Sequence, residues 1–353
     1  MITDIRLQHF RSYGDDSFEF SPGVNIIVGP NASGKTNLLE AILMLARGSS
    51  YRAKDNELIG YSDPWARLDA RLGDIQRTVK LTREPVLTKT YELDGKTLRR
   101  MTLAHSLPVV LFEPNHLQLL HSGPEQRRNY LDGLLEQIRP GFVTLRLQYR
   151  RTLAQRNALL KKSGPHALPQ LFPWDVRLSE LAGTIVRARE ELVTRINTQL
   201  NDLYGELSRS TTTVAAFYQP QFAPEHYESE LLKKLEHSAH VDVQRGFTAA
   251  GPHREDFVVL MDGHPVPDTA SRGETRTIIL ALKIIELQIL EEARGSLPLL
   301  LLDDVFSELD GARRHALTDH LKYYQTFITT TDADVVLKHF AKRANVIPIG
   351  SDK

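Results

Sequence analysis

The chain of 353 residues contains no cysteine, which excludes disulfide bonds and thiolate metal sites. It also lacks a long apolar run, because its most apolar stretch, Leu297–Leu302, is far below the roughly 20 residues that a transmembrane helix needs. The N-terminus, Met1–Arg6, has no apolar core of a secretion signal. Basic and acidic residues both number 44, so the net charge indicates no partner. We expect a cytoplasmic protein that does not enter membranes.

The chain shows no internal repeat, and its length suits two domains or one large domain with an insertion. Alternating apolar residues predict that 2–8 pairs with 17–28, and that three more strands form an antiparallel layer between about 66 and 98, closed by a hairpin at Asp94–Gly95. From about 116 to 208 the pattern is helical, with an interruption at 163–173. Further elements are expected at 211–217 (strand), 226–237 (helix), 257–261 (strand) and 275–293 (helix). These patterns predict an α/β fold carrying a helical insertion.

The stretch from Gly29 to Thr36, GPNASGKT, matches the phosphate-binding pattern G-x-x-x-x-G-K-[ST]. It follows the β-branched run Val24–Val28 and precedes apolar residues at helical spacing, which is the context that the motif requires. The two glycines allow successive backbone N–H groups to face phosphates at a helix N-terminus. Lys35 is expected to reach the β- and γ-phosphates, and Thr36 to bind Mg²⁺. The sequence therefore predicts a nucleotide site.

A second part of this site is expected at Leu299–Leu302, a buried-strand pattern that ends in Asp303 and Asp304. In a P-loop protein we expect such a strand beside the phosphate strand, so that Asp303 holds the Mg²⁺ shell and Asp304 polarises the attacking water. A core strand that ends in an acidic turn is the alternative. With the phosphate loop present, we interpret Lys35, Asp303 and Asp304 as catalytic residues.

The sequence around these carboxylates resembles that of ABC-type ATPases. Asp304–Asp310 is similar to their D-loop, and Ser271-Arg-Gly273-Glu, which precedes a long helical pattern, is similar to their signature motif. An ordinary helix capping box also has a Ser with a Glu three residues on. In ABC-type proteins the signature serine binds the γ-phosphate held by the other subunit, so the resemblance implies an ATP-dependent homodimer.

A closer resemblance covers the whole chain, which is similar to the RecF family of SMC-like ABC ATPases. Six ordered motifs carry it: Phe10–Tyr13 (FRSY), Gly29–Ile42 (GPNASGKTNLLEAI), Gly123–Asp132 (GPEQRRNYLD), Gly251–Arg254 (GPHR), Ser271–Gly273 (SRG) and Leu301–Asp310 (LLDDVFSELD). The resemblance implies an ABC-type P-loop ATPase head, with a mixed sheet core and an antiparallel layer, plus a helical arm domain. We expect the head at 1–115 and 245–353 and the arm at 116–244.

The resemblance also implies function and further site residues. It implies ATP and Mg²⁺ as cofactors, with Arg11, Asn37, Ser271 and Gly273 joining the loop residues Gly29, Pro30, Asn31, Ala32, Ser33, Gly34, Lys35 and Thr36 at the nucleotide. It implies ATP-dependent binding to DNA, either double-stranded or at single-strand/double-strand junctions and gaps. RecO and RecR are the implied partners, with which such proteins direct RecA onto gapped DNA.

Three departures from common ABC ATPases bear on hydrolysis. Asp304 stands where many carry Glu, Thr329–Asp332 has no switch histidine, and Phe112–Asn115 offers no Gln for the usual Q-loop. RecF-like proteins share the first two features, which suggest slow hydrolysis. The residue that replaces the Q-loop Gln stays open.

A basic segment is the candidate DNA site. Between Arg127 and Lys162 there are nine Lys or Arg and two acids, in a chain whose total charge is zero. Such an excess can neutralise phosphates along a groove, although a solvated helix face is the usual explanation of a charge run. The candidate contacts are Arg127, Arg128, Arg146, Arg150 and Arg151.

Two other functions compete with this interpretation. A transporter ATPase subunit is expected to keep the switch histidine and to carry an L-S-G-G-Q signature near its insertion, and this chain has neither. The ATPase half of an overcoming-lysogeny-type nuclease has similar N-terminal motifs but continues into a nuclease domain, for which the 43 residues after Asp310 leave no room. A long-armed SMC protein needs a longer insertion.

Overall fold

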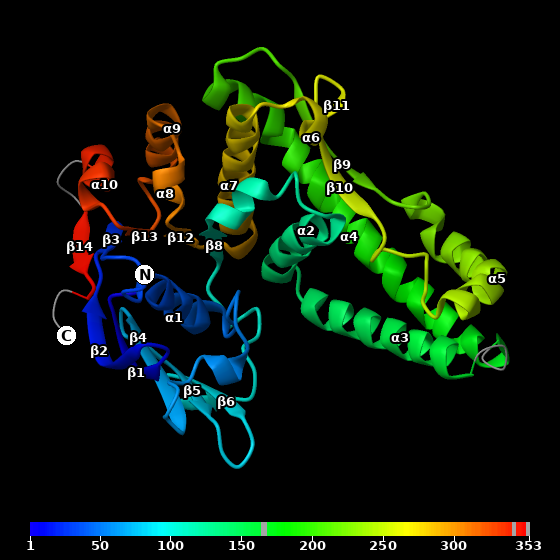
Figure 1. Cartoon of the computed structure of the whole chain (residues 1–353), viewed down its shortest axis with the longest axis horizontal. Helices are drawn as coiled ribbons and strands as arrows, with labels where there is room; N and C mark the ends of the chain where they lie inside the picture. The colour runs from blue at the N-terminus through cyan, green and yellow to red at the C-terminus, as the bar shows by residue number, and fades with distance from the viewer. Residues whose placement is uncertain (164–167, 341–343, 351–353) are drawn as a thin grey trace. The chain divides into compact units, whose positions relative to one another are not determined.

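The computed structural model describes residues 1–163, 168–340 and 344–350. Its contacts divide the chain into two compact units, of which the first joins Met1–Leu117 to Lys283–Lys353 and the second is Gln118–Leu282 (Figure 1). The helical insertion was expected to end at residue 244, whereas the second unit continues to Leu282. None of the described helices is long and apolar enough to cross a membrane.

The first unit is built on a five-stranded parallel sheet. Its order is β14 (Asn345–Pro348), β3 (Val24–Val28), β13 (Thr326–Thr330), β12 (Leu299–Asp303), β8 (Val109–Phe112). All five residues of both β12 and β13 are buried, as expected for the central strands of a covered parallel sheet. The prediction that β12 lies beside the phosphate strand β3 is wrong, because β13 pairs with both of them.

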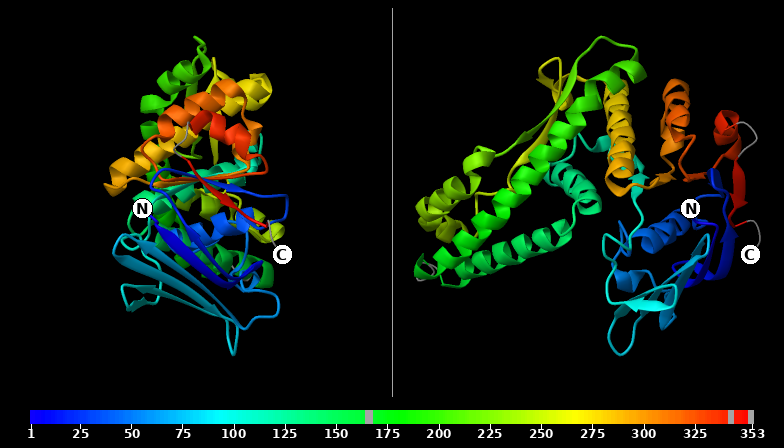
Figure 2. Two further views of the ribbon diagram at one scale, coloured as in Figure 1. Left: turned by 90° about the vertical axis from the view of Figure 1, so that its left-hand side faces the viewer. Right: turned by 180° about the vertical axis from the view of Figure 1, so that it is seen from behind.

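A six-stranded antiparallel sheet forms a second layer of this unit (Figure 2). Its order is β2 (Tyr13–Glu19), β1 (Asp4–Phe10), β4 (Trp65–Leu72), β5 (Ile75–Thr82), β6 (Thr88–Leu93), β7 (Lys96–Leu98). The predicted antiparallel layer is confirmed, and so is its hairpin, where Asp94 and Gly95 both have positive φ. The predicted partner of β1 is only partly right, because β2 pairs with it while β3 joins the parallel sheet.

Helix α1 (Lys35–Arg47) packs between the two sheets. Ten of its thirteen residues are buried, so it is apolar nearly all round, and its side chains join one core with those of β1, β4, β5 and β13. On the opposite face of the parallel sheet lie α8 (Val305–Glu308), α9 (Gly311–Leu321) and α10 (Ala333–Phe340) (Figure 1). Short 3-10 turns occupy Asp55–Glu57 and Pro114–Gln118. The N-terminus of α1 thus lies at the carboxyl edge of the parallel sheet, right after β3.

The second unit is mainly helical. It contains α2 (Pro124–Ile138), α3 (Phe142–Ser163), α4 (Leu168–Ser208), a 3-10 turn (Pro224–His226) and α5 (Tyr227–Arg245). The predicted helical region is confirmed. The predicted interruption at 163–173 is too long, because α4 already begins at Leu168 and contains Pro173; residues 164–167 lie outside the described part of the chain. The buried apolar residues of α4 recur at helical spacing from Leu178 to Leu203, so one face of this helix packs into the unit.

A small antiparallel sheet explains why the second unit extends beyond residue 244. It has the order β11 (His264–Pro265), β10 (Asp256–Met261), β9 (Val214–Gln219). Since β10 pairs with β9 over its full length, the chain stays in this unit past α5. The short helix α6 (Val266–Thr269) then leads to α7 (Arg272–Arg294).

Candidate nucleotide-binding site

The phosphate loop connects the end of β3 to the start of α1. Two of its residues have left-handed backbone, Ala32 with φ +64° and Gly34 with φ +107°. A Cβ atom on Gly29 would lie 2.4 Å from the carbonyl oxygen of Ile349, so only glycine fits there. The loop therefore has the tight curl over a helix N-terminus that binds anions in P-loop proteins.

Lys35 lies inside this curl and is only 4% exposed. Its Nζ atom donates to the carbonyl oxygens of Gly29 and Pro30, both at 2.9 Å. The Ser33 hydroxyl is buried and has no hydrogen-bond partner within the described residues. A buried ammonium bound to neutral carbonyls, beside an unpaired buried hydroxyl, favours an anionic ligand such as phosphate. The remaining loop residues, Asn31 and Ala32, are exposed.

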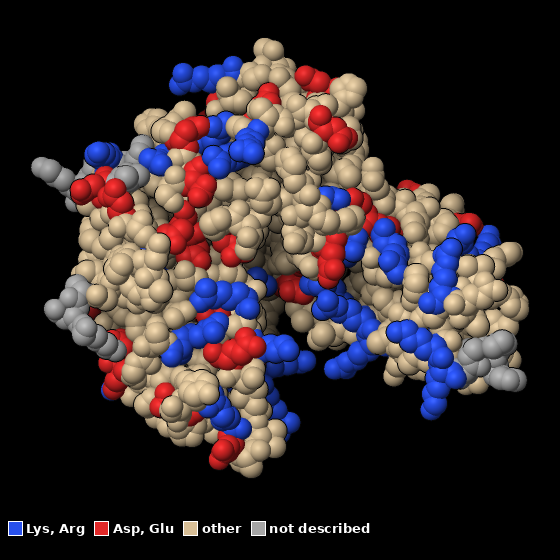
Figure 3. Space-filling model, in the orientation of Figure 1, with Lys and Arg blue, Asp and Glu red and all other residues tan. Residues whose placement is uncertain are grey.

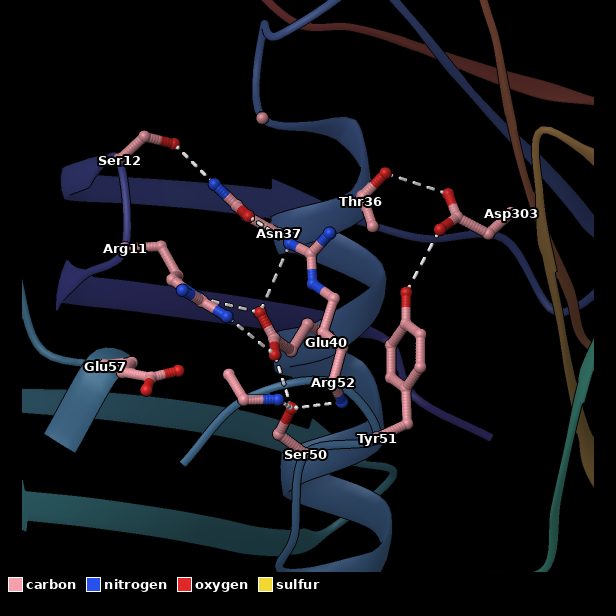
Figure 4. A network of polar contacts seen from close by, with 12 residues as sticks. Arg11, Ser12, Thr36, Asn37, Glu40, Ser50, Tyr51, Arg52, Glu57 and Asp303 are labelled. Atoms are coloured by element: carbon pink, nitrogen blue, oxygen red, sulfur yellow. Dashed lines mark hydrogen bonds and ion pairs between the residues drawn. The ribbon is translucent and has the colours of Figure 1, made fainter. Parts of the chain in front are cut away.

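Asp303, at the end of β12, is the centre of a group of hydroxyls. Its Oδ1 atom accepts a hydrogen bond from Thr36 (3.0 Å), and its Oδ2 atom accepts one from Tyr51 (3.0 Å) (Figure 4). Oδ1 also accepts a hydrogen bond from Thr329 (2.9 Å). These donors come from α1, from β13 and from the segment after α1. The structure thus brings Thr36 and Asp303 together, although β13 lies between their strands.

Thr36 and Asp303 have the oxygen donors that Mg²⁺ prefers. Two neighbouring oxygens of an octahedral site, each about 2.1 Å from the metal, lie about 3 Å apart. The separation between Thr36 Oγ1 and Asp303 Oδ1 is 3.0 Å. The described residues contain no group of three or more His, Cys, Asp or Glu that could hold a metal by itself. The pair therefore fits an ion that takes its other ligands from nucleotide and water.

Asp304 follows directly, with φ +53° and its backbone N–H donated to Thr329 Oγ1 at 2.8 Å. Burial raises the pKa of its carboxyl and the charge of Asp303 adds to this, against the opposing effect of Lys35. Burial, and then the charge of Asp303, also raises the pKa of Glu113, which lies in the region expected to replace the Q-loop. Raised carboxyl pKa values are typical of groups that exchange protons near neutral pH.

Arg11 and Asn37 do not contact each other, but Arg52 links Asn37 to the network around Glu40 that Arg11 joins (Figure 4). The Arg11 guanidinium donates two hydrogen bonds to Glu40, of 2.9 and 3.1 Å, and Ser50 donates another. Arg52 donates to Asn37 Oδ1 at 2.6 Å. Burial alone would raise the pKa of Glu40, but these hydrogen bonds and the two arginine charges outweigh it and lower the pKa.

Sequence reasoning missed Glu40, Ser50, Tyr51 and Arg52. Glu40 offered a signal, because it is the only acid in α1 and stands between buried apolar residues. For Tyr51 there was no signal, since its contact with Asp303 joins positions 252 residues apart.

Ser271 and Gly273 lie in the second unit, at the start of α7. The Ser271 hydroxyl accepts the backbone N–H of Glu274 (3.2 Å), and the Glu274 carboxylate accepts the N–H of Ser271 (2.8 Å). These bonds form the capping box that the sequence also allowed, and the hydrogen bonds from Ser271 lower the pKa of Glu274. Ser271 itself is exposed.

The basic residues fall into two groups. Arg127 donates to both carboxylate oxygens of Asp256, at 2.8 and 2.6 Å, and Arg146 pairs with Asp132 (3.1 Å) and Glu136 (2.5 Å). These two charges are neutralised inside the fold, because the side chains are only 13% and 17% exposed.

The other three candidates are Arg128, Arg150 and Arg151, none of which pairs with a carboxylate in the described part of the chain. Arg128 donates to the carbonyl oxygen of Glu255 (2.5 Å), while Arg150 and Arg151 are exposed. On the face shown in Figure 3, basic and acidic side chains are interspersed over both units. On this face, the basic side chains therefore form local groups and not one large basic surface.

Comparisons with known proteins agree with these motifs. The family model described as RecF/RecN/SMC N terminal domain matches residues 1–348. The DNA replication and repair protein RecF of Gloeobacter violaceus is 35% identical over an alignment of 363 positions, which covers 99% of this chain and 96% of that protein.

Solved structures also include RecF proteins that are similar to this chain. One described as the recombination mediator protein RecF with ATP, in the RecFOR pathway, has 30% identity and a TM-score of 0.83 over 94% of this chain and 92% of that one. An Smc head bound to part of ScpA, at 16% identity and a TM-score of 0.54 over 96% and 91%, shows likeness of fold alone. The predicted ABC-type ATPase head is thereby confirmed, and the chain belongs to the RecF family of RecF/RecN/SMC proteins.

Proposed function

We propose that the chain binds ATP with Mg²⁺ and hydrolyses it slowly, as a switch that controls its binding to DNA in recombinational repair and replication-gap repair. The observation that carries the proposal is the meeting of Thr36 with Asp303 at the phosphate loop, where Lys35 is buried against neutral carbonyls. The ATP bound in a solved RecF structure and the DNA repair role in the description of RecF relatives support it.

Each residue of the site has a role in this proposal. Residues Gly29–Asn37 and Arg11 hold the nucleotide, and Lys35 stabilises negative charge on the β- and γ-phosphates. Thr36 and Asp303 hold Mg²⁺, which neutralises the developing charge when bound. Asp304, whose pKa is raised by burial, accepts a proton from the attacking water.

We also propose an ATP-dependent homodimer, in which Ser271 and Gly273 at the start of α7 approach the γ-phosphate held by the partner's loop. The exposed position of Ser271 at a helix N-terminus, where the dipole favours anions, supports this role. A solved RecF structure at 30% identity belongs to the RecFOR pathway, which supports RecO and RecR as partners in directing RecA onto gapped DNA. In this scheme the second unit is the helical arm, and Arg128, Arg150 and Arg151 are its DNA contacts.

The proposal is tested by separating nucleotide binding from turnover. We expect Lys35→Met to abolish ATP affinity, while Asp304→Asn keeps it and loses roughly 10²–10⁴-fold in hydrolysis rate. Lys96→Met, on the exposed strand β7, is the matched control that removes one lysine elsewhere in the first unit. Native hydrolysis by Asp304→Asn would exclude Asp304 as the base.

Binding to a gapped duplex, measured with and without ATP and alongside sedimentation, tests the switch. We expect ATP to raise both DNA affinity and the sedimentation coefficient, and Lys35→Met to show neither effect. DNA affinity that does not respond to ATP would contradict the switch.

A further inference from the structure

A cavity of about 380 Å³ lies within the second unit, between α2, α3, α4 and the segment 252–254. Its volume falls within the range of small-ligand pockets. Two acids line it, Glu125 and Asp132, against five arginines: Arg128, Arg146, Arg150, Arg189 and Arg254. The lining therefore carries an excess of three positive charges, although the whole chain is neutral.

The floor of this arginine pocket is a rigid, buried network. Arg189 is 4% exposed and makes two hydrogen bonds of 2.9 Å with the carboxylate of Asp132. It also donates to Tyr218 Oη (2.9 Å) and to the carbonyl oxygen of Pro252 (2.8 Å). Because one side chain ties three other segments together, the floor of the pocket is held in place before any ligand arrives.

The segment that carries Arg254 is fixed as well. The Nε2 atom of His253 donates to the carbonyl oxygen of Thr248 (3.1 Å), so its Nδ1 atom accepts the hydroxyl of Tyr149 (2.7 Å). Gly251 has φ +121°, and a Cβ atom there would lie 2.8 Å from that hydroxyl, which excludes any larger residue. The backbone N–H of Arg254 donates to the carbonyl oxygen of Gly251 (2.8 Å), so the turn that carries Arg254 is tied to this close contact.

Two of the five arginine charges are balanced inside the pocket and three are not. Arg146 and Arg189 share Asp132. Arg128, Arg150 and Arg254 come from three different segments, and within the described residues none of them pairs with a carboxylate. Arg254 only stacks on the ring of Phe247, at 4.9 Å from its centre. Burial, and then the positive charge of Arg189, lowers the pKa of Arg128. An anion bound in the pocket would stabilise the charged form of this guanidinium.

We propose that the arginine pocket binds one phosphate group of DNA. Guanidinium forks match phosphate oxygens in pairs, and three forks that converge from separate segments can enclose a single phosphate. A contact of this kind fixes the position of the protein on DNA and reads no sequence. The inference rests on the proposed DNA binding and adds where one phosphate is held.

The first arm of the test measures affinity for a gapped duplex between about 50 and 200 mM salt. If Arg150 and Arg254 hold the same phosphate, the double variant Arg150→Gln/Arg254→Gln flattens the slope of log K against log salt by about one unit. Lys233→Gln, which removes an exposed charge of α5, is the matched control and leaves the slope unchanged. An unchanged slope in the double variant overturns the pocket, and a loss of two units overturns the single shared phosphate.

The second arm uses inorganic phosphate and the Lys35→Met chain, in which the phosphate loop is disabled. In a Trp65→Phe background, where Trp174 fluorescence follows the second unit alone, we expect phosphate to raise the unfolding midpoint and the double variant to lose this rise. A rise of equal size in the double variant overturns the pocket. If the wild type does not bind DNA at all, the proposed function fails. If the double variant in that case still loses the phosphate-induced rise of the unfolding midpoint, the pocket binds a free phosphate compound, and the proposal that its phosphate belongs to DNA is overturned.

Discussion

Replacing Arg189 with Met tests how the second unit is held together. The substitution keeps an unbranched side chain but removes the charge that faces Asp132, which is 4% exposed. Breaking a buried ion pair from one side costs about 3–5 kcal/mol, and the carbonyl of Pro252, left without its donor, falls within that total. Because Arg146 still contacts Asp132 at 3.1 Å, we expect a loss in the lower half of that range.

The loss is measurable because the two tryptophans of the chain, Trp65 and Trp174, lie in different units. In a Trp65→Phe background, Trp174 fluorescence follows the unfolding of the second unit alone. A domain of this size loses about 2–4 °C of Tm per kcal/mol, so the midpoint should fall by roughly 6–16 °C.

The control is Arg187→Met, two positions earlier in α4. Arg187 is 43% exposed and pairs with Glu228, so its loss should cost under about 1 kcal/mol. Arg189→Lys should lie between the two, because an ammonium cannot make the paired contacts of a guanidinium. If Arg189→Met unfolds within 1 kcal/mol of the wild type, the reasoning about a buried, indispensable charge is refuted.

Three further predictions concern the site and the pocket. Tyr51→Phe removes one of the hydrogen bonds to Asp303, and we expect ATPase activity to need roughly 10–100-fold more Mg²⁺, which a magnesium titration measures. An unchanged requirement for Mg²⁺ would show that the Tyr51 hydroxyl does not support metal binding. Ser271→Arg and Lys35→Met should each lack ATPase activity and dimerisation, and mixing them should restore part of the activity through one intact composite site, whereas full activity of Ser271→Arg alone would exclude a shared site. Burial lowers the pKa of His253 to about 4, so the folded state keeps it neutral while the unfolded chain binds a proton below pH 6.5. Stability should therefore fall as the pH drops from 6.5 to 4, by up to about 3 kcal/mol, and chemical denaturation at both pH values should show a smaller fall in His253→Gln.

The sequence predicted the parts of the site that depend on neighbouring residues. Gly34 and Lys35 belong to a contiguous motif, and Asp303 was recognisable because four leucines precede it. The strand between them was missed, because three of the five residues of β13 are threonines, which resemble a polar loop until burial is known. Threonine packs well in a strand, and Thr329 uses its hydroxyl on Asp303.

Charge pairing was the other part that the sequence did not reveal. Arg127 reads as a free cation in a basic segment, yet its partner Asp256 lies 129 positions away on β10. Arg146 likewise pairs with acids of α2 after the chain turns back on itself. A count of charges in a segment gives the electrostatic excess, but the pairing that decides which charges face solvent is set by tertiary contacts.

The parallel sheet of the first unit has a consequence for how the protein is made. Strand β3, which carries the phosphate loop, pairs with β13 and β14, and Asn25 and Thr326 are hydrogen-bonded across 301 positions. At a ribosomal rate of about 5–20 residues per second, β3 waits roughly 15–60 s for its neighbours. During that time the second unit, contiguous in sequence, can fold, while the unpaired backbone N–H and C=O groups of β3 are open to pairing with other chains. The phosphate loop also contacts Ile349, whose N–H donates to the carbonyl oxygen of Val28, so the nucleotide site is complete only after residue 349 has been made.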